Sequence, residues 1–346
     1  MLAAGDNLIN ITILNDAKKD GYNFAPIYSQ IAPLIQSADT AFINQETILG
    51  GSQFNYSGYP QFNTPSTMAQ ALASAGFTVV NHANNHTMDM GEAGILAAMD
   101  TWDSFPEIAV LGIHRGSEKQ PCIITKNNIS LGFLSYTYGT NGIPLPRNKP
   151  WIVSMIDRKT MAAEIDSLRP LCDFLAVSIH WGDEYSFEPT AVQTELAQFL
   201  ASHNVDVVIG HHPHVLQRME YLPRPDGGQT VCFYSLGNFA NNQDRAETAL
   251  GGLAYVQFVK QDDELSIGVT GIIPVISHFE TNFTKTQVIP YYAYTDELLQ
   301  KHRGVSRHTN FSKEYFETIL AALNTNIYRS NPFENNTGAT SQAHGN

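Results

Sequence analysis

The sequence predicts an α/β protein built on a mainly parallel β-sheet. Short apolar runs rich in β-branched residues, such as residues 205–209, alternate with longer segments whose apolar residues recur at helical spacing. A run that is apolar at nearly every position, as residues 205–209 are apart from Asp206, is typical of a parallel strand covered on both faces. Alternating strands and helices imply right-handed crossovers, which place the carboxyl ends of successive strands at one edge of the sheet.

Length and composition set limits on the class of protein. A chain of 346 residues, 43% of them hydrophobic, suits one large α/β domain or one domain with an extension. The sequence has no run of about 18 apolar residues, so no membrane span is predicted. The net charge of −13 argues against nucleic acid as a partner, because such a partner requires a basic surface. The three cysteines lack CxxC spacing and are expected to be core residues.

The amino terminus leaves the localisation open. Residues 1–6 resemble the end of a strand and lack the charged segment and apolar core of a secretory leader. We therefore expect an upstream segment in the natural protein. If that segment were an anchor, the chain would be associated with the cell envelope.

The first half of the chain predicts strands that alternate with helices. Strands are expected at residues 2–4, 40–43, 77–80 and 109–111, and helices at residues 26–37, 65–75 and 91–102. Residues 50–63 are rich in Gly, Ser, Tyr and Asn and predict a loop, a candidate substrate-facing segment.

The second half adds a hairpin and more strand–helix units. Residues 123–125 and 129–135 predict a hairpin, which suggests a second sheet layer. Strands are expected at residues 173–179, 205–209 and 231–235, β structure at residues 253–259 and 265–268, and helices at residues 157–168, 190–202 and 311–328. Asp157 is a candidate helix cap. Four histidines without a strand-end context are expected to be structural or surface residues: His278, His302, His308 and His344.

The strongest functional signal follows the strand at residues 205–209. That strand stops at Gly210, and His211, His212 and His214 come directly after it, with Pro213 stiffening the backbone. A single histidine there would more often be a hydrogen-bonded structural residue. Three in four positions favour a metal site, because imidazole is the commonest metal-binding side chain near neutral pH.

Polar residues also follow the other predicted strands. The candidates for chemistry are Asp6, Glu46, Asn85, His86, Asp89 and His180. Because the strand ends meet at one sheet edge, these side chains are expected to converge there with the histidines. Carboxylate, imidazole and amide ligands suit one or two divalent transition metals, Mn, Fe or Zn, and a carboxylate can bridge a pair. A plain polar turn is the alternative for the segment around Glu46.

Further polar and aromatic residues in the strand-end loops, and in the loop at residues 136–150, are candidate substrate-binding residues. They are Asn44, His82, Arg115, Tyr138, Asn141, Trp181, Glu184 and Asn238. A solvated loop accounts equally well for residues 136–150.

Six of these stretches occur in the order of a known family. They are residues 5–6, 44–47, 83–91, 178–185, 212–214 and 234–239. With them the chain resembles the CapA family of poly-gamma-glutamate capsule synthesis proteins, within the calcineurin-like metallophosphoesterase superfamily. The resemblance covers roughly residues 1–275 and implies a four-layer α/β/β/α sandwich. Residues 276–330 are then expected to be an extension packed on that domain, and residues 331–346 a disordered tail.

The resemblance also implies a site with two metals. By motif, Asp6 and His214 would hold the first metal, and Glu46 would bridge to the second. The remaining ligands of the second metal would be Asn85, His180 and His212. His211 is not a ligand in the family's pattern.

Catalysis in the family pattern depends on a histidine beside the metals. His86 would contact the leaving group, and Asp89 is the second candidate catalytic residue. Two departures affect the metals: Leu8 stands where the wider superfamily has histidine, and Glu46 stands where it has aspartate. The first metal site is therefore short of a ligand and is expected to bind weakly or be empty.

Two functions remain open from the sequence. The first is a metal-dependent hydrolase or transferase acting on a phosphoester or an anionic gamma-glutamyl polymer, with His86 as proton donor. The second is a non-catalytic accessory protein that uses the same metal site to bind anionic polymer or membrane-bound capsule synthase subunits. Fold resemblance alone does not establish catalysis.

Overall fold

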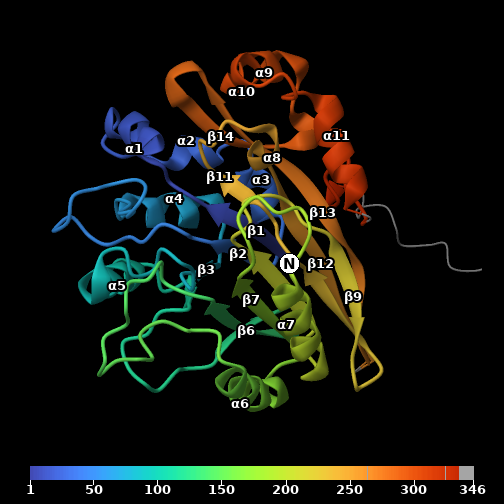
Figure 1. Ribbon diagram of the computed structural model, residues 1–346. Coiled ribbons are helices and arrows are strands. Elements are labelled where there is room, and N and C mark those ends of the chain that lie inside the picture. Colours follow the sequence, from blue (N-terminus) through green and yellow to red (C-terminus); the bar gives the residue numbers. More distant parts are fainter. Residues whose placement is uncertain (263, 324, 335–346) are drawn as a thin grey trace, which may run out of the picture.

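The computed structural model describes residues 1–262, 264–323 and 325–334. Two β-sheets pack face to face, and helices cover their outer faces (Figure 1). This arrangement confirms the predicted α/β class and its four layers. None of the helices in the described part of the chain has the length and hydropathy needed to span a bilayer.

Within the described residues, the larger sheet has eight strands. Their spatial order is β14 (Thr284–Pro290), β13 (Glu264–Glu280), β12 (Leu250–Gln261), β1 (Leu2–Asn7), β2 (Ala41–Asn44), β3 (Val79–Asn81) and β4 (Ala109–Leu111), and β11 (Asn238–Ala240) pairs with β1 beyond this path. Strands β1 to β4 are parallel, whereas β12 to β14 are antiparallel additions to that parallel core.

The smaller sheet has six strands in the described chain. Their order is β5 (Cys122–Lys126), β6 (Ile129–Thr137), β7 (Phe174–His180), β8 (Val207–His211), β10 (Gln229–Phe233) and β9 (Met219–Pro223). The hairpin predicted at residues 123–135 is the antiparallel pair β5 and β6, and it does begin a second sheet. Strands β6, β7, β8 and β10 are parallel, and helices α6 and α7 form the crossovers between β6, β7 and β8.

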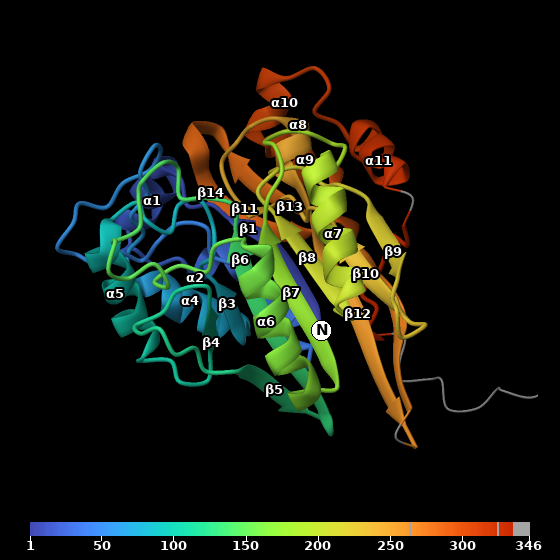
Figure 2. The same ribbon diagram turned by 60° about the horizontal axis from the view of Figure 1, so that its bottom comes forward.

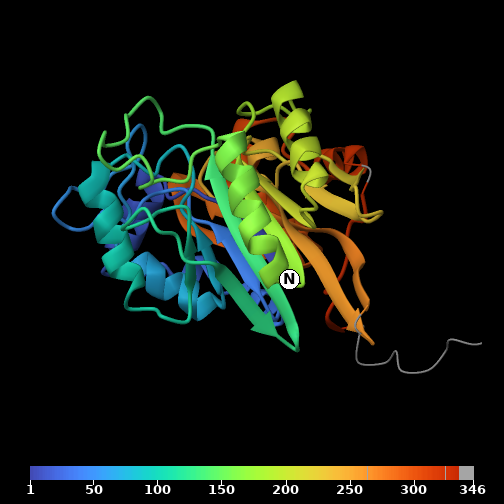
Figure 3. The same ribbon diagram turned by 90° about the horizontal axis from the view of Figure 1, so that it is seen from below.

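Helices lie on both outer faces. Those on the larger sheet are α1 (Ile11–Lys18), α2 (Ala25–Tyr28), α3 (Ala32–Gln36), α4 (Thr67–Ala75) and α5 (Gly91–Trp102). Those on the smaller sheet are α6 (Arg158–Leu168) and α7 (Ala191–Ser202). Figure 2 shows α6 and α7 against the smaller sheet, and Figure 3 shows the blue and teal helices on the opposite side of the molecule.

Strand periodicity explains how the layers are joined. In β1, Leu2 and Ala4 point into the cluster under helices α1 to α5, whereas Ala3 points toward the other sheet. In β8, Ile209 lies between the sheets and Val208 packs under α6 and α7. Because both faces are covered, these strands are apolar at almost every position.

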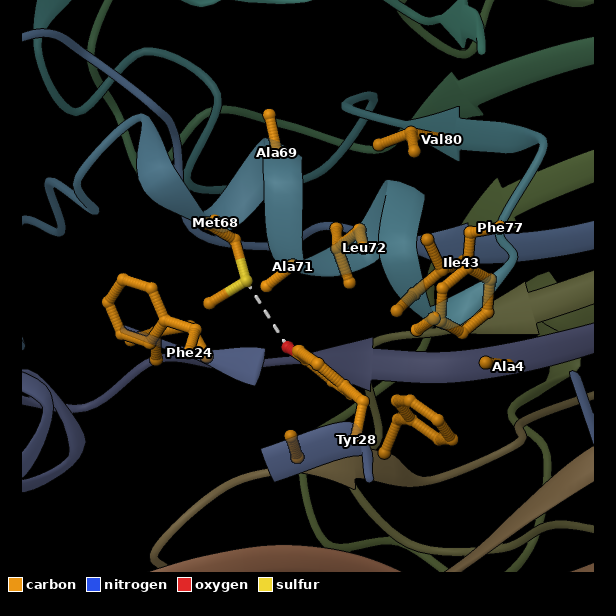
Figure 4. Close-up of a cluster of buried hydrophobic side chains, with 14 of the residues drawn as sticks. Ala4, Phe24, Tyr28, Ile43, Met68, Ala69, Ala71, Leu72, Phe77 and Val80 are labelled. Carbon is orange, nitrogen blue, oxygen red and sulfur yellow. Dashed lines mark hydrogen bonds between the residues drawn. The ribbon is translucent and has the colours of Figure 1, made fainter. Parts of the chain in front are cut away.

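The outer cluster of the larger sheet is packed around Tyr28 and Met68 (Figure 4). The Tyr28 hydroxyl donates a hydrogen bond to Asn7 Oδ1 at 2.8 Å and lies 3.2 Å from Met68 Sδ. Leu72 and Phe77 complete the packing on α4 and the following turn. Burial of each such apolar side chain contributes about 1.5–3 kcal/mol, so this layer holds β1 and its polar end firmly in place.

Two helix starts follow the rules read from the sequence. Asp157 Oδ1 accepts a hydrogen bond from the backbone N–H of Thr160 at 2.9 Å and caps α6. At α7, Thr190 and Gln193 form a reciprocal capping box. The predicted starts of both helices are confirmed.

Other predicted elements are corrected. The helix expected at residues 26–37 is divided into α2 and α3, because Pro33 lacks the N–H that a continuous helix would use. The helix expected at residues 311–328 is the shorter α11 (Lys313–Ala322), capped by Ser312. Helix α1 and strands β9, β11 and β14 were not expected from the sequence.

The segment after residue 275 continues the larger sheet. Strand β13 crosses the proposed domain boundary, β14 pairs with it, and α8 (Ala246–Ala249), α9 (Asp296–Lys301), α10 (Arg303–Arg307) and α11 pack on this half of the molecule. Short 3-10 turns occupy Arg169–Leu171, Thr281–Phe283 and Tyr291–Ala293. The ring of Phe333 packs on Tyr255. Residues 335–346, including His344, lie outside the described residues, so the predicted tail there stays a prediction.

His302 and His278 are structural histidines in this segment, as expected. His302 is 2% exposed; its Nδ1 accepts a hydrogen bond from the backbone N–H of Gly304, and its Nε2 lies 3.1 Å from the carbonyl oxygen of Ser277. His278 Nδ1 lies 2.9 Å from the Tyr294 hydroxyl. Burial lowers the pKa of His302 to about 3 and that of His278 to about 4.

Stability is therefore expected to fall in mildly acidic solution. An unfolded imidazole takes up a proton near pH 6.5, whereas folded His302 stays neutral until the pH approaches its lowered pKa. Below pH 6.5 each such histidine costs up to about 1.4 kcal/mol per pH unit. Urea unfolding of wild type and His302→Asn between about pH 8 and 5 measures this, and the variant should show the shallower loss. Equal slopes in the two proteins would contradict the assignment.

Candidate metal centre

The carboxyl ends of five parallel strands bring the predicted site residues together. In the larger sheet, Asp6 of β1 is in register with Asn44 of β2, and Asn44 with Asn81 of β3. In the smaller sheet, His180 of β7 is in register with His211 of β8. Since the sheets pack face to face, the polar ends of both lie against each other, as the sequence predicted.

Asp6, Glu46 and His214 form the first group. One ligand atom from each residue lies within 4.8 Å of the others. Asp6 Oδ2 is 3.2 Å from His214 Nδ1, and Glu46 Oε1 is 3.7 Å from His214 Nε2. All three side chains are buried.

Glu46 also belongs to a second group, with His180 and His212. Its Oε1 lies 3.9 Å from His180 Nε2. Asn85 completes this side of the cluster, because its Oδ1 lies 2.9 Å from the same His180 nitrogen. Glu46 is therefore the residue that the two groups share, the place that the family pattern gives to a bridging ligand.

Polar atoms at the middle of the cluster are left without partners. Both carboxylate oxygens of Glu46 and the Nδ1 atom of His212 are buried and have no hydrogen-bond partner among the described residues. A buried carboxylate without partners costs several kcal/mol unless a cation compensates it. One ligand atom each of Glu46, His180 and His212 lie within 4.8 Å of one another, a set that could hold a divalent cation.

The pKa values of the cluster follow from burial and from its charges. Burial raises the pKa of Glu46 well above its usual value and lowers that of His180 well below it. Burial opposes the charge on Asp6 as well, but contacts with His211 and His214 hold its pKa well below the usual range. The carboxylates of Glu46 and Asp6 outweigh burial at His214 and raise its pKa to about 9. The buried groups of the cluster thus influence one another's protonation strongly.

The backbone around the histidines is strained. His212 and His214 have φ values of 101° and 59°, in the left-handed region that residues with a Cβ rarely adopt. Tyr185, at φ 65°, donates its backbone N–H to the carbonyl oxygen of Pro213 at 2.8 Å. Such residues cost about 1–3 kcal/mol each and tend to mark functional sites. With this backbone conformation, His212 and His214 both contribute imidazoles to the cluster.

His86 and Asp89 form a pair beside the cluster. His86 Nδ1 lies 2.8 Å from Asp89 Oδ2, and the same carboxylate oxygen accepts the backbone N–H of Phe62 at 2.7 Å. Asn141 links this pair to the cluster: its Nδ2 lies 3.3 Å from His86 Nδ1, and its Oδ1 accepts from Asn85 Nδ2 at 3.2 Å. His86 is therefore held next to the metal ligands without belonging to either group.

Three of the predicted substrate-binding residues stand at the exposed side of the cluster. The ring of Tyr138 is half exposed and lies 4.8 Å from that of His212. Asn141 is exposed as well. Glu184, also exposed, has a carboxylate oxygen within 4.8 Å of ligand atoms of His212 and His214. Because Leu8 contributes no ligand atom, Glu184 is a candidate for an additional ligand.

Other predicted substrate-binding residues have structural roles, which corrects the prediction for them. Trp181 is buried and donates from Nε1 to the carbonyl oxygen of Tyr234. His82 is buried and accepts from Trp102 Nε1 at 2.8 Å. Burial lowers the pKa of His82 to about 3, so it is a neutral core histidine.

Asn44 and Asn238 are buried supports of the ligands. Asn44 donates to Asp6 Oδ1 at 2.8 Å, and Asn238 donates to the backbone carbonyl of His214 at 3.3 Å. Arg115 lies at the surface, where it pairs with two acidic residues, Asp100 and Asp103. These predictions assigned substrate contacts from strand-end position alone, which does not determine which way a side chain points.

Sequence reasoning missed several supporting residues. The ring of Phe62 packs edge-on against that of His86 at 4.6 Å, and Asn84 Oδ1 accepts the backbone N–H of His86. Gln243 connects Asn238 to the hydroxyl of Tyr185. Phe62 lies in residues 50–63, which the sequence predicts to be a candidate substrate-facing loop. No local pattern identifies Gln243.

His211 lies next to the cluster but outside both groups. It is fully buried, its Nδ1 is 3.3 Å from Asp6 Oδ1, and its ring stacks on Phe42. We expect His211→Ala to keep its metal at the wild-type level, because none of the candidate metal-binding groups among the described residues includes His211. Elemental analysis of purified His211→Ala beside His212→Ala tests this. Loss of metal from both variants would make His211 a ligand.

Two facing sheets with a buried cluster of His, Asp and Glu at the strand ends define an α/β sandwich protein with a candidate metal centre. Residues 1–243 match the family described as bacterial capsule synthesis protein PGA_cap, and the chain belongs to that family. The resemblance drawn from the six sequence motifs is thereby confirmed.

Two proteins named CapA are similar to this chain in sequence. The chain is 28% identical over 297 residues to the PGA biosynthesis protein CapA of Bacillus subtilis (strain 168), covering 83% of this chain and 72% of the relative. It is 27% identical over 279 residues to the capsule biosynthesis protein CapA of Bacillus anthracis, covering 77% of this chain and 65% of the relative. The chain therefore spans about two thirds to three quarters of the length of these relatives.

Solved structures of similar chain path are more distant. A 5'-nucleotidase precursor from Thermus thermophilus has a TM-score of 0.49 and 12% identity, over 93% of this chain and 59% of that one. The calcineurin-like phosphoesterase YfkN from Bacillus subtilis has a TM-score of 0.45 and 11% identity, over 93% of this chain and 97% of that one.

Proposed function

We propose that the protein is a metal-dependent hydrolase or transferase that acts in capsule biosynthesis, on a phosphoester or on an anionic gamma-glutamyl polymer. The observation that supports it most is Glu46: a fully buried carboxylate with no hydrogen-bond partner among the described residues, shared by two ligand groups. Without a bound cation, both oxygens of this buried carboxyl group would lack a hydrogen bond among the described residues, which is costly for a buried polar group.

The donor set fits one or two ions of Mn, Fe or Zn. Three imidazoles, two carboxylates and an amide oxygen are borderline ligands, whereas Mg would require mostly oxygen. Divalent metals supply charge stabilisation and water activation at neutral pH. Asp6, Glu46 and His214 would hold one such ion, and Glu46, His180 and His212 with Asn85 would hold the other.

His86 is placed to move a proton. In its doubly protonated form, His86 can keep Nδ1–H bonded to Asp89 and give the Nε2 proton to the oxygen of a departing group, which leaves the ring neutral. Asp89 is itself fixed by the backbone N–H of Phe62, so it holds the imidazole in one orientation. Tyr138 and Asn141, at the exposed side, are the proposed contacts for the rest of the substrate.

Turnover with defined metals tests the proposal. Protein freed of metal and reloaded with Mn, Fe or Zn is assayed on nitrophenyl phosphate and on a panel of gamma-glutamyl peptides. We expect turnover that requires metal and is lost in His212→Ala. Metal binding without turnover of any of these substrates would instead support the alternative, an accessory protein that binds polymer or capsule synthase subunits.

A further inference from the structure

Glu184 lies in a loop that is tied to the chain around the ligand histidines. The next residue, Tyr185, donates its backbone N–H to the carbonyl oxygen of Pro213 at 2.8 Å, and Pro213 stands between the two histidines. The carbonyl oxygen of Ser186 accepts a hydrogen bond from Gln217 Nε2 at 2.8 Å. The backbone that carries Glu184 is therefore held beside the metal centre, although its side chain is exposed.

The carboxylate of Glu184 faces the histidines and has no other partner. One of its oxygens lies within 4.8 Å of ligand nitrogens of both His212 and His214. Its side chain forms no hydrogen bond or ion pair with any residue that the structure describes. A solvated surface group is the ordinary explanation for an exposed glutamate. The neighbouring Asp183 fits that explanation, since it is exposed too but belongs to none of the ligand groups among the described residues.

The three ligand groups of the cluster share residues in pairs. Glu46 is common to the first two groups, whereas Glu184 forms a third group with His214 of the first and His212 of the second. Glu184 thus reaches ligands of both groups, as Glu46 does. Glu46 does so from the buried side and Glu184 from the exposed side.

We propose that Glu184 is the outer ligand of the metal centre, and that an incoming oxyanion displaces it. The inference rests on the metal site of the proposed function and not on turnover. The first group has only three ligands, because Leu8 supplies no donor, and Glu184 adds the fourth that a metal such as Zn usually takes. An exposed carboxylate can leave the centre without opening the core, so it is the ligand that gives way when another anion arrives. The first metal site is then filled, in contrast to the weak or empty site expected from the sequence.

Metal titration tests the ligand role. Glu184→Gln keeps the size of the side chain and removes its charge, and Asp183→Asn makes the same change at the adjacent exposed residue. Protein freed of metal is titrated with Zn or Mn by calorimetry, and bound metal is counted by elemental analysis. We expect wild type to bind two equivalents, Glu184→Gln to bind one of them at least about 10-fold more weakly, and Asp183→Asn to stay within about twofold of wild type.

Binding of inorganic phosphate tests the displacement. It is measured by calorimetry at saturating Mn, so that all three proteins carry the same metal. We expect Glu184→Gln to bind phosphate about 3- to 10-fold more tightly than wild type, because the competing negative charge is gone. Asp183→Asn has the same net charge as Glu184→Gln and should change phosphate affinity by less than about twofold.

Two results would overturn the inference. The first is equal metal affinity in Glu184→Gln and Asp183→Asn, with circular dichroism showing both to be folded. The second is phosphate binding by Glu184→Gln that is no tighter than binding by the control. If the metal and phosphate results are as expected but no tested substrate is turned over, Glu184 is the outer ligand and the catalytic proposal fails. Turnover in a protein whose metal affinity ignores Glu184 would do the reverse.

Discussion

His180→Ala and His212→Ala are each expected to purify with less than about a tenth of the metal found in wild type. Each variant removes a nitrogen ligand from the group that contains Glu46, and loss of an outer supporting residue alone costs a metal site about 10- to 100-fold in affinity. The remaining ligands cannot compensate, because Asn85 contributes only a neutral amide oxygen. Elemental analysis after identical purification measures the effect.

The matched control is His203→Ala, which removes a histidine that lies near Asp166, away from the cluster. Circular dichroism establishes that the ligand variants remain folded, and their apo forms should bind added Zn more weakly in a titration. Unchanged metal content in both His180→Ala and His212→Ala would end the metal-site interpretation.

His86→Ala is expected to keep its metal while losing about 10²- to 10⁴-fold in turnover, the usual contribution of a positioned proton donor. His86 is 6% exposed and lies outside both ligand groups, so its removal leaves the metal donors in place. The loss should be smaller for nitrophenyl phosphate than for phenyl phosphate, because a weakly basic leaving group needs less protonation. Rates of both substrates with both proteins give the comparison.

Asp89→Asn separates the donor from its support. It preserves the size of the side chain that orients His86 but removes the charge, so we expect an intermediate rate loss and an altered pH profile with unchanged metal. If His86→Ala lowers the rates of both phosphates equally, His86 contacts the substrate without acting as an acid. Metal loss from His86→Ala would place it among the ligands instead.

Much of the fold can be predicted from local patterns in the sequence. The apolar run that became β8 and the cap at Asp157 were readable because their signals lie within a few residues of each other. The convergence of Asp6 with His212 and His214 was readable too, since parallel strands joined by right-handed crossovers share one edge for their ends.

Patterns that depend on distant residues were not readable. Strand β11 pairs with β1, with Asn238 opposite Asp6, and these two residues lie at opposite ends of the matched region. Helix 26–37 was misjudged because Pro33 interrupts a face whose apolar spacing is otherwise continuous. Trp181 and His82 follow strands as the candidate ligands do, but their side chains pack into the core.

The sequence by itself determined the class of the protein, the alternation of strands and helices in its parallel core, and the residue types gathered at the sheet edge, because these follow from local periodicity and chain chirality. Only the tertiary structure decided that both carboxylate oxygens of Glu46 are buried without a hydrogen-bond partner and that Glu184 stands beside the histidines. Each of these depends on which way a side chain points once two sheets and the segment after residue 275 have packed together, and the free energy that decides it comes from contacts between parts far apart in the chain.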